Sequence, residues 1–469
     1  MRSNSTVFQG MGGVAGQPAS GLKVEVLRDL RGIIPEWWEL FTRCPDATPF
    51  QAPAWLLPWW KYFGRREPLV VAARRDNQLC GLALFYIYKT KKKGRQLFFI
   101  GKAVSDYLDV LIAPDEQRVH VAEALINCAS ASAGIWDSAD LDRLPPHSPF
   151  LQIEHRAGMR VMQIREGVCP QLALGGCNLE DFVKKKSTLI NMRNRRRRAR
   201  DAGAVEFVTA DVTSIVVLMH DLLGLHSKRW NSIGLTGMFA DESMTGFLTE
   251  AAHELLAGGM LRLHAMRLNG QSIAVSFGML HAGRAYLYNF GFDPAYAAIA
   301  PATQVIAFAM EQAAREGARV FDFLQGDEPY KFETWGAEPH YTYRLRYFPQ
   351  SAQASNALFT KSIAEGNEMA GDPRKQQDER SPERKGDLEA QWDELGTDPA
   401  QVGLDSAGQD GSLQRVSTVR EATEHSPGRL AAVDGIEDAT DHPERPVHTH
   451  EDYGNPEDVP PQNREDEAA

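Results

Sequence analysis

The sequence lacks the features of a membrane-spanning or secreted protein. It contains no run of about 18 apolar residues, the length that a transmembrane helix needs. Residues 1–20 are polar and glycine-rich, without the apolar centre of a signal peptide. Cysteine is scarce: the five cysteines are odd in number, widely scattered, and form neither a C-x-x-C pair nor a cluster with histidine at metal-ligand spacing. These absences predict a cytoplasmic protein with no transmembrane segment and no structural metal.

The chain does have enough apolar residues for folded cores. Its 469 residues are 43% hydrophobic and 9% aromatic, which suits two or three domains. The charge is uneven: residues 351–469 hold 11 Lys and Arg against 27 Asp and Glu, a net of -16, whereas residues 1–350 hold 40 against 35, a net of +5. The acidic segment is also poor in aromatics, so it cannot bury enough apolar surface to offset its ordering entropy. We expect a disordered acidic tail, acting either as a solubilising extension or as an arm that competes with anions for the basic body.

Residues 261–324 predict the order strand, strand, strand, helix, strand. Two apolar-rich runs flank Asn269-Gly270, a pair that favours a type I′ hairpin turn because both residues tolerate positive φ. A third strand is predicted over 284–290, and Pro301 suits the first turn of the helix that follows. A buried strand is then predicted over 319–324. The second half of the chain therefore has a β-β-β-α-β pattern.

The first half has a comparable pattern. Its hairpin over residues 69–85 shares five residues with the later hairpin, each displaced by 192 positions: Leu69, Ala73, Arg75, Asn77 and Phe85 recur as Leu261, Ala265, Arg267, Asn269 and Phe277. A strand, a helix and a strand are predicted after it, in the same order as in the second half. We therefore predict an α/β (α+β) fold with two related units. The predicted organisation is a flexible leader at 1–21, an N-terminal unit at 22–176, a C-terminal unit at 177–350 and the tail at 351–469.

The densest positive charge lies between the two units, from Lys184 to Arg200. On a helix over residues 179–202 these side chains would point in every direction, so they cannot all lie against one core. One hypothesis is an electrostatic platform for RNA, an acidic acyl carrier protein or a phosphorylated substrate, for which arginine is well shaped. The other is a solvated helix.

A second group of polar residues closes the helix predicted over residues 212–229. His226, Arg229 and Trp230 are candidates to line a substrate cleft. A single histidine on a helix also suits a purely structural role. Arginine beside tryptophan is more specific, because the pair presents both a cation and a stacking surface.

Four stretches carry a resemblance to a known family. They are Gly101–Asp109 (GKAVSDYLD), Leu225–Trp230 (LHSKRW), Tyr288–Asp293 (YNFGFD) and Phe321–Phe332 (FDFLQGDEPYKF), of which the last is the most specific. Together they resemble the GNAT-type acetyltransferase family associated with bacterial cellulose and exopolysaccharide biosynthesis. They are also similar, more distantly, to the FemAB-like tandem-GNAT peptidyltransferases. The resemblance covers residues 22–350.

The resemblance implies two tandem GNAT-like acyltransferase domains. In that fold the strands before and after the second unit's helix separate, and the acyl-pantetheine arm of the donor lies between them. The unpaired amides at the start of the helix then face the donor's phosphates. The Gln/Arg-x-x-Gly-x-Gly/Ala loop of coenzyme-A-using members is absent, so the implied co-substrate is acyl-CoA or another acyl thioester, with no metal. The residues implied for donor binding are Ala302, Thr303, Gln304 and Asn289.

The resemblance also implies catalytic residues near the Gly326–Phe332 loop. Lys331 would supply positive charge to an oxyanion or a phosphate, and Tyr330 would donate a proton to the leaving group. Asp322 and Asp327 are candidate bases, although the sequence around Asp327 also suits a simple turn. The candidates for holding a polar acceptor are Ser105, Asp106, Tyr107 and Asp109 of the first unit, residue types that Asx turns also use.

We therefore expect an acyltransferase that carries an acyl group from an acyl thioester to nitrogen or oxygen. The expected acceptor is a sugar, an amino sugar or another cell-envelope or exopolysaccharide precursor. One alternative is an aminoacyl-tRNA-dependent, FemAB-like peptidyltransferase, with tRNA bound by the Lys184–Arg200 segment. The other is a non-catalytic GNAT scaffold within a polysaccharide-synthesis complex.

Overall fold

A computed structural model describes residues 6–8, 21–27, 29–64, 67–90, 94–131, 136–153 and 159–349. The predicted acidic tail and most of the predicted leader lie outside the described residues. Within these ranges, no helix is both long enough and apolar enough to cross a bilayer.

The described strands form two sheets, so the fold is mixed α/β, as predicted. The first sheet has the order β1 (Thr6–Phe8), β2 (Leu22–Leu27), β3 (Glu67–Arg75), β4 (Gln78–Thr90), β5 (Gly94–Phe99), β7 (Ser138–Leu144), β15 (Tyr341–Pro349), β8 (Met159–Val168), with β6 (Leu111–Ile112) paired to β4. The second has the order β10 (Val205–Thr209), β11 (Leu261–Leu268), β12 (Gln271–His281), β13 (Arg284–Phe292), β14 (Val320–Asp322), β9 (Gln171–Ala173).

Each sheet contains a strand from the other half of the chain. β15, which ends the described chain, pairs with both β7 and β8 in the first sheet. β9, which precedes residue 176, pairs with β14 at the edge of the second sheet. The two sheets are therefore interlocked across the unit boundary near residue 176, which itself stays a prediction.

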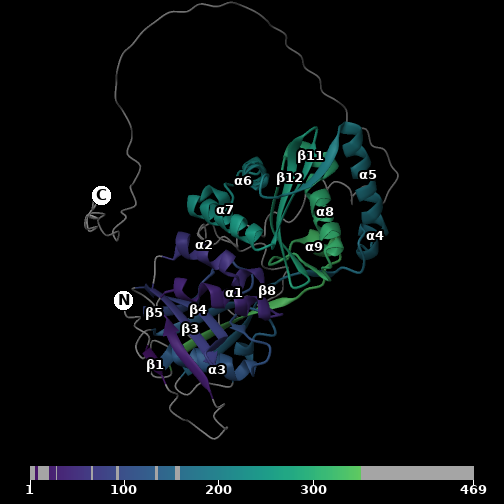
Figure 1. Cartoon of the computed structure of the whole chain (residues 1–469). Helices are drawn as coiled ribbons and strands as arrows, with labels where there is room; N and C mark the ends of the chain where they lie inside the picture. Colours follow the sequence, from purple (N-terminus) through teal and green to yellow (C-terminus); the bar gives the residue numbers. More distant parts are fainter. Residues whose placement is uncertain are drawn as a thin grey trace, which may run out of the picture. The chain divides into compact units, whose positions relative to one another are not determined.

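Helices cover both faces of each sheet (Figure 1). On the first sheet, α1 (Ile34–Arg43) and α2 (Pro53–Phe63) lie on one face and α3 (Arg118–Ala131) on the other. On the second, α6 (Ile215–Ser232) and α7 (Glu242–Ala257) face α8 (Pro301–Arg315) across the sheet, and α5 (Lys186–Ala202) lies beside α8. The shorter helices are α4 (Leu179–Phe182) and α9 (Pro329–Glu333).

Turn residues explain where several elements begin and end. The predicted turn at Asn269-Gly270 is confirmed, with φ angles of 52° and 80°, and α8 begins at Pro301 as expected. The strand predicted over 319–324 is shorter, because Leu324 has a left-handed φ of 59° that turns the chain out of the sheet. The single helix predicted over 179–202 is broken, because Val183 takes an extended conformation and packs into the core.

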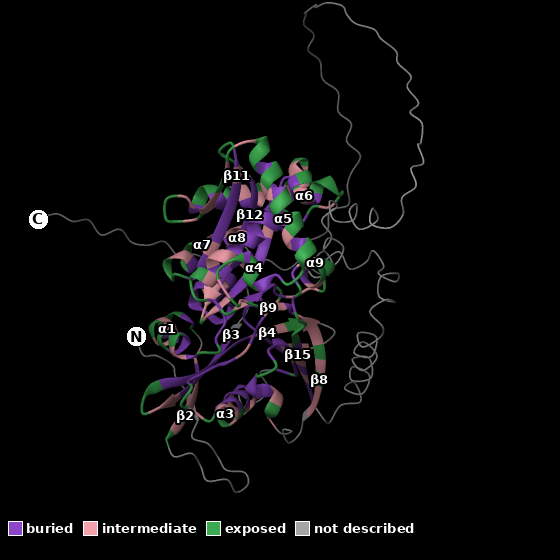
Figure 2. Cartoon of the chain, turned by 90° about the vertical axis from the view of Figure 1, so that its right-hand side faces the viewer, coloured by how far each residue is buried: buried purple, intermediate pink, exposed green. Residues whose placement is uncertain are grey.

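The two halves share one apolar core (Figure 2). The ring of Trp55 on α2 packs against Phe247 on α7, with centroids 4.9 Å apart. Trp37 and Trp55 are fully buried, so their rings are part of this core. A buried tryptophan removes ~150–250 Å² from water, worth about 4–6 kcal/mol before entropy is counted. The halves are therefore held together by packing as well as by exchanged strands.

Candidate active site

The strands β13 and β14 separate near the middle of the second sheet. They pair in parallel over three residues each, Arg284–Tyr286 with Val320–Asp322. Just beyond this ladder the register between β12 and β13 shifts, and Tyr288 is the extra residue on β13. Such a bulge bends its strand and increases the local twist. We name the region beyond Tyr286 and Asp322 the divergence point of the two strands.

Tyr330 lies beside the divergence point. Its ring meets Phe290 of β13 and Phe323, just after β14, in edge-on contacts with centroids 6.3 and 6.2 Å apart. The guanidinium of Arg229 lies 5.1 Å from the centre of the Phe290 ring. Burial raises the pKa of Tyr330 well above its ordinary value, and the nearby charge of Glu328 acts in the same direction. The ring of Tyr330 therefore contacts both diverging chain segments, and its hydroxyl stays protonated.

Lys331 faces its own loop. Its side chain is 3% exposed, and Nζ donates to the carbonyl oxygens of Leu324, Gln325 and Gly326 at 3.1–3.3 Å. It also forms an ion pair with Glu328 at 2.7 Å, which is not aligned as a hydrogen bond. These contacts hold the turn that the left-handed Leu324 begins. The catalytic role of Lys331 stays a prediction, whereas its support of the loop is visible in the contacts.

Asp322 is the centre of a buried polar network between the halves. Its carboxylate accepts hydrogen bonds from the hydroxyl of Tyr107 and the amide of Gln171, both at 2.9 Å, and from the backbone N–H of Leu324. The guanidinium of Arg284 lies 3.5 Å away. Burial raises the pKa of Asp322 to about 6, against the lowering effect of Arg284. Both carboxylate oxygens are thus engaged by the protein itself.

Asp106 completes the junction from the first half. It accepts a hydrogen bond from the backbone N–H of Gln325 and lies within the electrostatic reach of Arg143 and Lys331. Burial raises its pKa, and its charge in turn raises the pKa of the bulged Tyr288. The structure therefore brings four predicted residues together across the two halves: Asp106, Tyr107, Asp322 and Lys331.

Three other predicted residues lie away from this junction. Ser105 is buried and accepts a hydrogen bond from the indole of Trp55 at 2.9 Å. Asp109 accepts hydrogen bonds from the backbone N–H of Val110 and the hydroxyl of Ser148. Asp327 is exposed at the surface of its loop. Their predicted roles therefore have no contact with Asp322 to support them.

Two of the three residues predicted on α6, His226 and Arg229, pack the helix against β13. His226 is buried and accepts a hydrogen bond from Trp230 at 2.7 Å, and burial lowers its pKa to about 3. A Cβ added at Gly291 would lie 2.5 Å from the backbone nitrogen of His226, which shows how closely helix and strand approach. Arg229 alone among the three reaches the aromatic residues near Tyr330. The substrate-binding role of all three residues stays a prediction.

The residues predicted to bind the donor are mostly covered. Asn289 is buried, and its amide lies 3.0 Å from the sulfur of Met238. At the start of α8, Ala302, Thr303 and Gln304 are all buried. Ala302 packs in the same apolar cluster as Ala199 of α5. Donor phosphates would therefore meet α5 near these amides, and their contact with the helix start stays a prediction.

The equivalent position in the first half is filled by the chain itself. β5 and β7 pair in parallel over only two residues each before they separate. The loop after β5 then crosses the space: Leu108 donates to the carbonyl oxygen of Arg143, and Lys102 forms a 2.5 Å ion pair with Asp142. The second half therefore offers the better place for an acyl arm.

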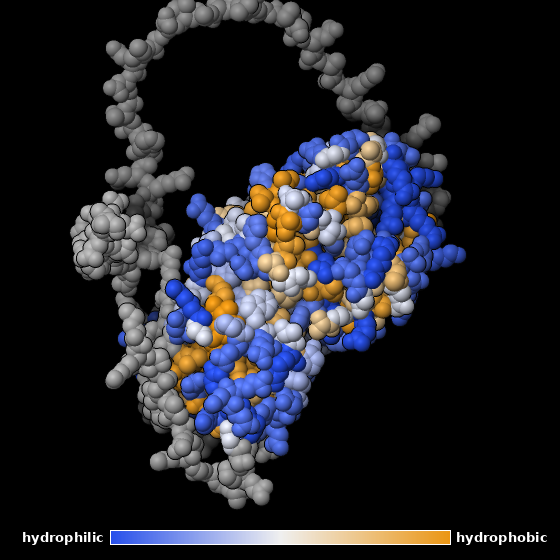
Figure 3. Space-filling model, in the orientation of Figure 1, coloured by the Kyte–Doolittle hydropathy of each residue, from blue (hydrophilic) through white to orange (hydrophobic). Residues whose placement is uncertain are grey.

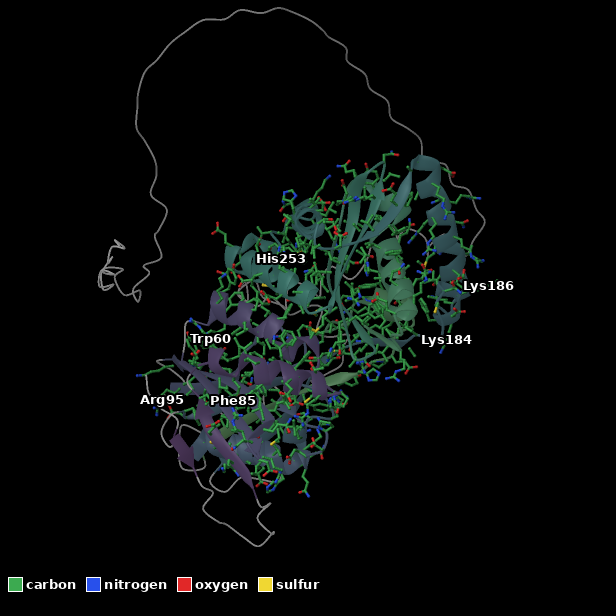
Figure 4. All side chains as sticks on the ribbon, viewed as in Figure 1. Trp60, Phe85, Arg95, Lys184, Lys186 and His253 are labelled. Atoms are coloured by element: carbon green, nitrogen blue, oxygen red, sulfur yellow. The ribbon has the colours of Figure 1, made fainter. Side chains whose placement is uncertain are left out.

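The helix α5 has one buried face and one exposed, basic face. Thr188, Met192, Arg195 and Ala199 are buried, at the spacing of one helical face. The basic stripe comprises the exposed residues Lys184, Lys185, Lys186, Arg193, Arg197, Arg198 and Arg200. Figure 3 shows the strongly hydrophilic surface along the edge where α4 and α5 lie, and Figure 4 labels Lys184 and Lys186 there. The stripe is therefore available to a polyanion.

Two residues of the Asp322 network were not predicted. Arg284 could have been found from the predicted β-α-β order, because it begins the strand that runs parallel to the one ending in Asp322. Gln171 carries no such signal, because the three-residue strand β9 is recognisable only from its partner. Among the described residues, no group of three or more His, Cys, Asp or Glu side chains is arranged to hold a metal ion.

Comparisons with known proteins agree with part of this picture. Residues 186–332 match a family model described as acetyltransferase (GNAT) domain. No protein of curated function matches the sequence. Similar solved structures include FemX (13% identity, TM-score 0.47, covering 66% of this chain and 95% of that one) and the C-terminal domain of a protein described as a lysylphosphatidylglycerol synthetase from Agrobacterium fabrum (12%, 0.43, 71% and 96%). A tandem GNAT protein from the clavulanic acid biosynthesis pathway is a third (12%, 0.40, 71% and 99%).

These structural likenesses are too distant to carry an argument about activity. The family match covers less than half of the chain, but it contains β13, α8, β14 and the loop to Phe332. Residues 186–332 are therefore similar to a GNAT acetyltransferase domain over the part of the chain that contains the divergence point.

Proposed function

We propose that the protein transfers an acyl group from an acyl thioester to an amine or hydroxyl acceptor at the divergence point of β13 and β14. The observation that carries the proposal is the placement of Tyr330, whose ring contacts Phe290 and Phe323 on the two diverging segments and whose hydroxyl stays protonated. A leaving thiolate needs a proton donor at this place. The family match of residues 186–332 supports the same reaction class.

In the proposed reaction the acceptor's nitrogen or oxygen attacks the thioester carbonyl carbon. The new carbon–nitrogen or carbon–oxygen bond forms, the carbon–sulfur bond breaks, and the thiolate takes its proton from Tyr330. We assign the acceptor's proton to Asp106, because Asp106 is partly accessible and lies near the bulge, whereas the oxygens of Asp322 are already engaged. Asp106 then returns a proton to Tyr330 through solvent, so the protein ends unchanged.

The donor class is acyl-CoA or another acyl thioester. The proposed acceptor is a sugar, an amino sugar or an envelope precursor, and it rests on the family resemblance of the four motifs. Residues of both halves meet at Asp322, so an acceptor could touch both. Lys331 supports this site by holding residues 324–326 in place.

The test is thiol release from a panel of acyl thioesters, with amine and hydroxyl acceptors. Tyr330→Phe and Asp106→Asn should each lower turnover by about 10²–10⁴-fold, the usual contribution of general acid or base catalysis. Tyr341→Phe is the matched control, because Tyr341 is exposed on β15. Turnover of Tyr330→Phe equal to that of the unaltered protein would remove the assignment. Absence of turnover with every donor would favour the non-catalytic scaffold.

The basic stripe favours a second candidate, an aminoacyl-tRNA-dependent transferase. Seven exposed cations lie on α5 and just before it, and within the described part of the chain Arg193 is the one of the seven that forms an ion pair, with Glu180. Each phosphate contact releases counterions, so binding would weaken steeply with salt. The same surface would also suit an acidic carrier protein that delivers the acyl thioester.

Binding to charged tRNA over a range of salt concentrations separates these candidates. For tRNA the logarithm of affinity should fall linearly with the logarithm of salt concentration, and Arg193→Gln with Arg197→Gln should reduce the slope by about two. Lys23→Gln with Arg31→Gln is the control, since both residues are exposed on the first half. A protein without affinity for tRNA at low salt is not of this second class.

A further inference from the structure

A cavity of about 180 Å³ lies in the first half of the chain. Tyr107 and Asp109 line it, together with residues from the loop after α1, the start of α3 and the loop after β7. The hydroxyl of Tyr107 also donates a hydrogen bond to Asp322, which is not among the lining residues. The cavity is therefore separate from the divergence point, although one side chain contacts both regions.

The cavity lies beside the loop that follows β5, the same loop that fills the gap between β5 and β7. β5 and β7 are parallel neighbours, and α3 lies between them in the chain. The segments that follow both strands contribute to its wall.

Opposite charges are arranged around the cavity. Asp109 lies within it, and its Oδ1 accepts hydrogen bonds from Val110 N–H at 2.8 Å and from Ser148 Oγ at 2.9 Å. No described residue donates a hydrogen bond to Oδ2. Arg118 is half-buried at the wall and forms a 2.6 Å ion pair with Asp46, whose side chain is half exposed. The guanidinium has five N–H donors, so this ion pair leaves donors for a second anion.

The carboxyl of Asp109 is desolvated by the residues around it. This desolvation raises the pKa of the carboxyl to about 7, against the lowering effects of Val110, Ser148 and Arg118. A cationic ligand group beside Asp109 would favour the ionised form of the carboxyl. Because that carboxylate is poorly solvated, its attraction to the cation would be stronger than in water. The lining holds two carboxyls, one guanidinium and His147, whose pKa is lowered by burial so that the neutral imidazole is favoured. These groups leave no excess of positive charge, which disfavours a phosphate or another strong anion.

The volume limits the ligand's size. At ~30 Å³ for each water molecule, the cavity corresponds to about six waters. A ligand of roughly six to ten non-hydrogen atoms would fill it. Val110, Leu111 and Ile112 also line the cavity and supply apolar contacts beside the charged groups.

We propose that this cavity binds a small zwitterion of the amino-acid type, with its ammonium on Asp109 and its carboxylate on Arg118. The site does not depend on the proposed acyl transfer.

Calorimetric titration of the whole protein tests the proposal. The zwitterion probes are glycine, alanine, serine and threonine. Ethanolamine carries the ammonium alone, propionate carries the carboxylate alone, and glycerol carries neither charge. We expect saturable binding of at least one zwitterion. Its affinity should be at least about ten-fold higher than that of ethanolamine, propionate or glycerol, a difference of ~1.4 kcal/mol in binding free energy. The assignment would be overturned if no zwitterion bound at about 10 mM, or if ethanolamine, propionate or glycerol bound as tightly as the zwitterions.

Variants locate the binding. Asp109→Asn and Arg118→Gln should each weaken it about ten-fold or more. Asp115→Asn should leave it unchanged, because Asp115 is an exposed carboxylate outside the cavity lining. Unchanged affinity in both cavity variants would place the ligand elsewhere. If Asp109→Asn does not fold, as judged by circular dichroism, Arg118→Gln and the ligand panel still decide.

Discussion

The hydroxyl of Tyr107 donates a 2.9 Å hydrogen bond to the carboxylate of Asp322, across 215 positions of sequence. Both residues are buried, and both belong to segments predicted to bind or transform substrate. Gln171 donates to the same carboxylate oxygen, so three distant parts of the chain meet at one atom.

Removal of the Tyr107 hydroxyl should destabilise the fold. In Tyr107→Phe the buried carboxylate of Asp322 loses a donor, which costs about 1–3 kcal/mol. The free energy of unfolding in urea measures the effect. Tyr341→Phe, at an exposed position, should stay within about 0.5 kcal/mol of the unaltered protein. Equal losses in the two variants would mean that the hydrogen bond to Asp322 adds no stability.

The ion pair of Lys331 with Glu328 should be costly to break from one side. Lys331→Met leaves the buried Glu328 carboxylate without its cation, and the loss should reach about 3–5 kcal/mol. The double variant Lys331→Met with Glu328→Gln removes both charges and should recover much of that loss. Chemical denaturation of the two proteins decides the point. A double variant no more stable than the single one would contradict an electrostatic origin.

Asp322 should make stability depend on pH. Its folded pKa of about 6 exceeds the ordinary value of 3.8, so the folded state holds the proton more tightly. This contribution is fully present below about pH 4 and is lost as the pH rises through about 6, a change of ~3 kcal/mol.

Unfolding free energies measured between pH 4 and 8 test that dependence. Asp322→Asn should flatten the decline between about pH 4 and 6, since its amide does not titrate. Asp109, whose pKa is raised to about 7, should extend the remaining decline to higher pH with the same sign. Parallel curves for the unaltered protein and Asp322→Asn would exclude Asp322 as the source.

The close approach of α6 to β13 should tolerate no added methyl group at Gly291. The new Cβ would meet the backbone of Leu225 and His226, so Gly291→Ala should destabilise by about 1–3 kcal/mol. It should also shift Arg229 relative to Tyr330 and lower any turnover. Gly224→Ala on the same helix has open space around it and should be neutral or stabilising by up to ~1 kcal/mol. Thermal unfolding of both variants makes the comparison, and equal melting temperatures would contradict the packing argument.

Local elements were readable in the sequence because their causes are local. Asn269-Gly270 takes positive φ wherever it stands, and Pro301 suits a helix start regardless of its neighbours in space. The charges of α5 were equally plain, but their division between buried Arg195 and the exposed basic stripe required the surface against which the helix packs. The shortened β14 likewise depended on the turn at Leu324.

Sequence alone therefore determined the mixed α/β class, the two hairpins and the motif segments around Asp106 and Lys331. Tertiary structure decided that β15 enters the first sheet, that Tyr107 reaches Asp322, and that the ammonium of Lys331 points at its own loop. The physical reason is the range of the forces involved. Backbone dihedral preferences act between neighbours in sequence, whereas strand exchange and buried polar networks depend on which distant segments pack together.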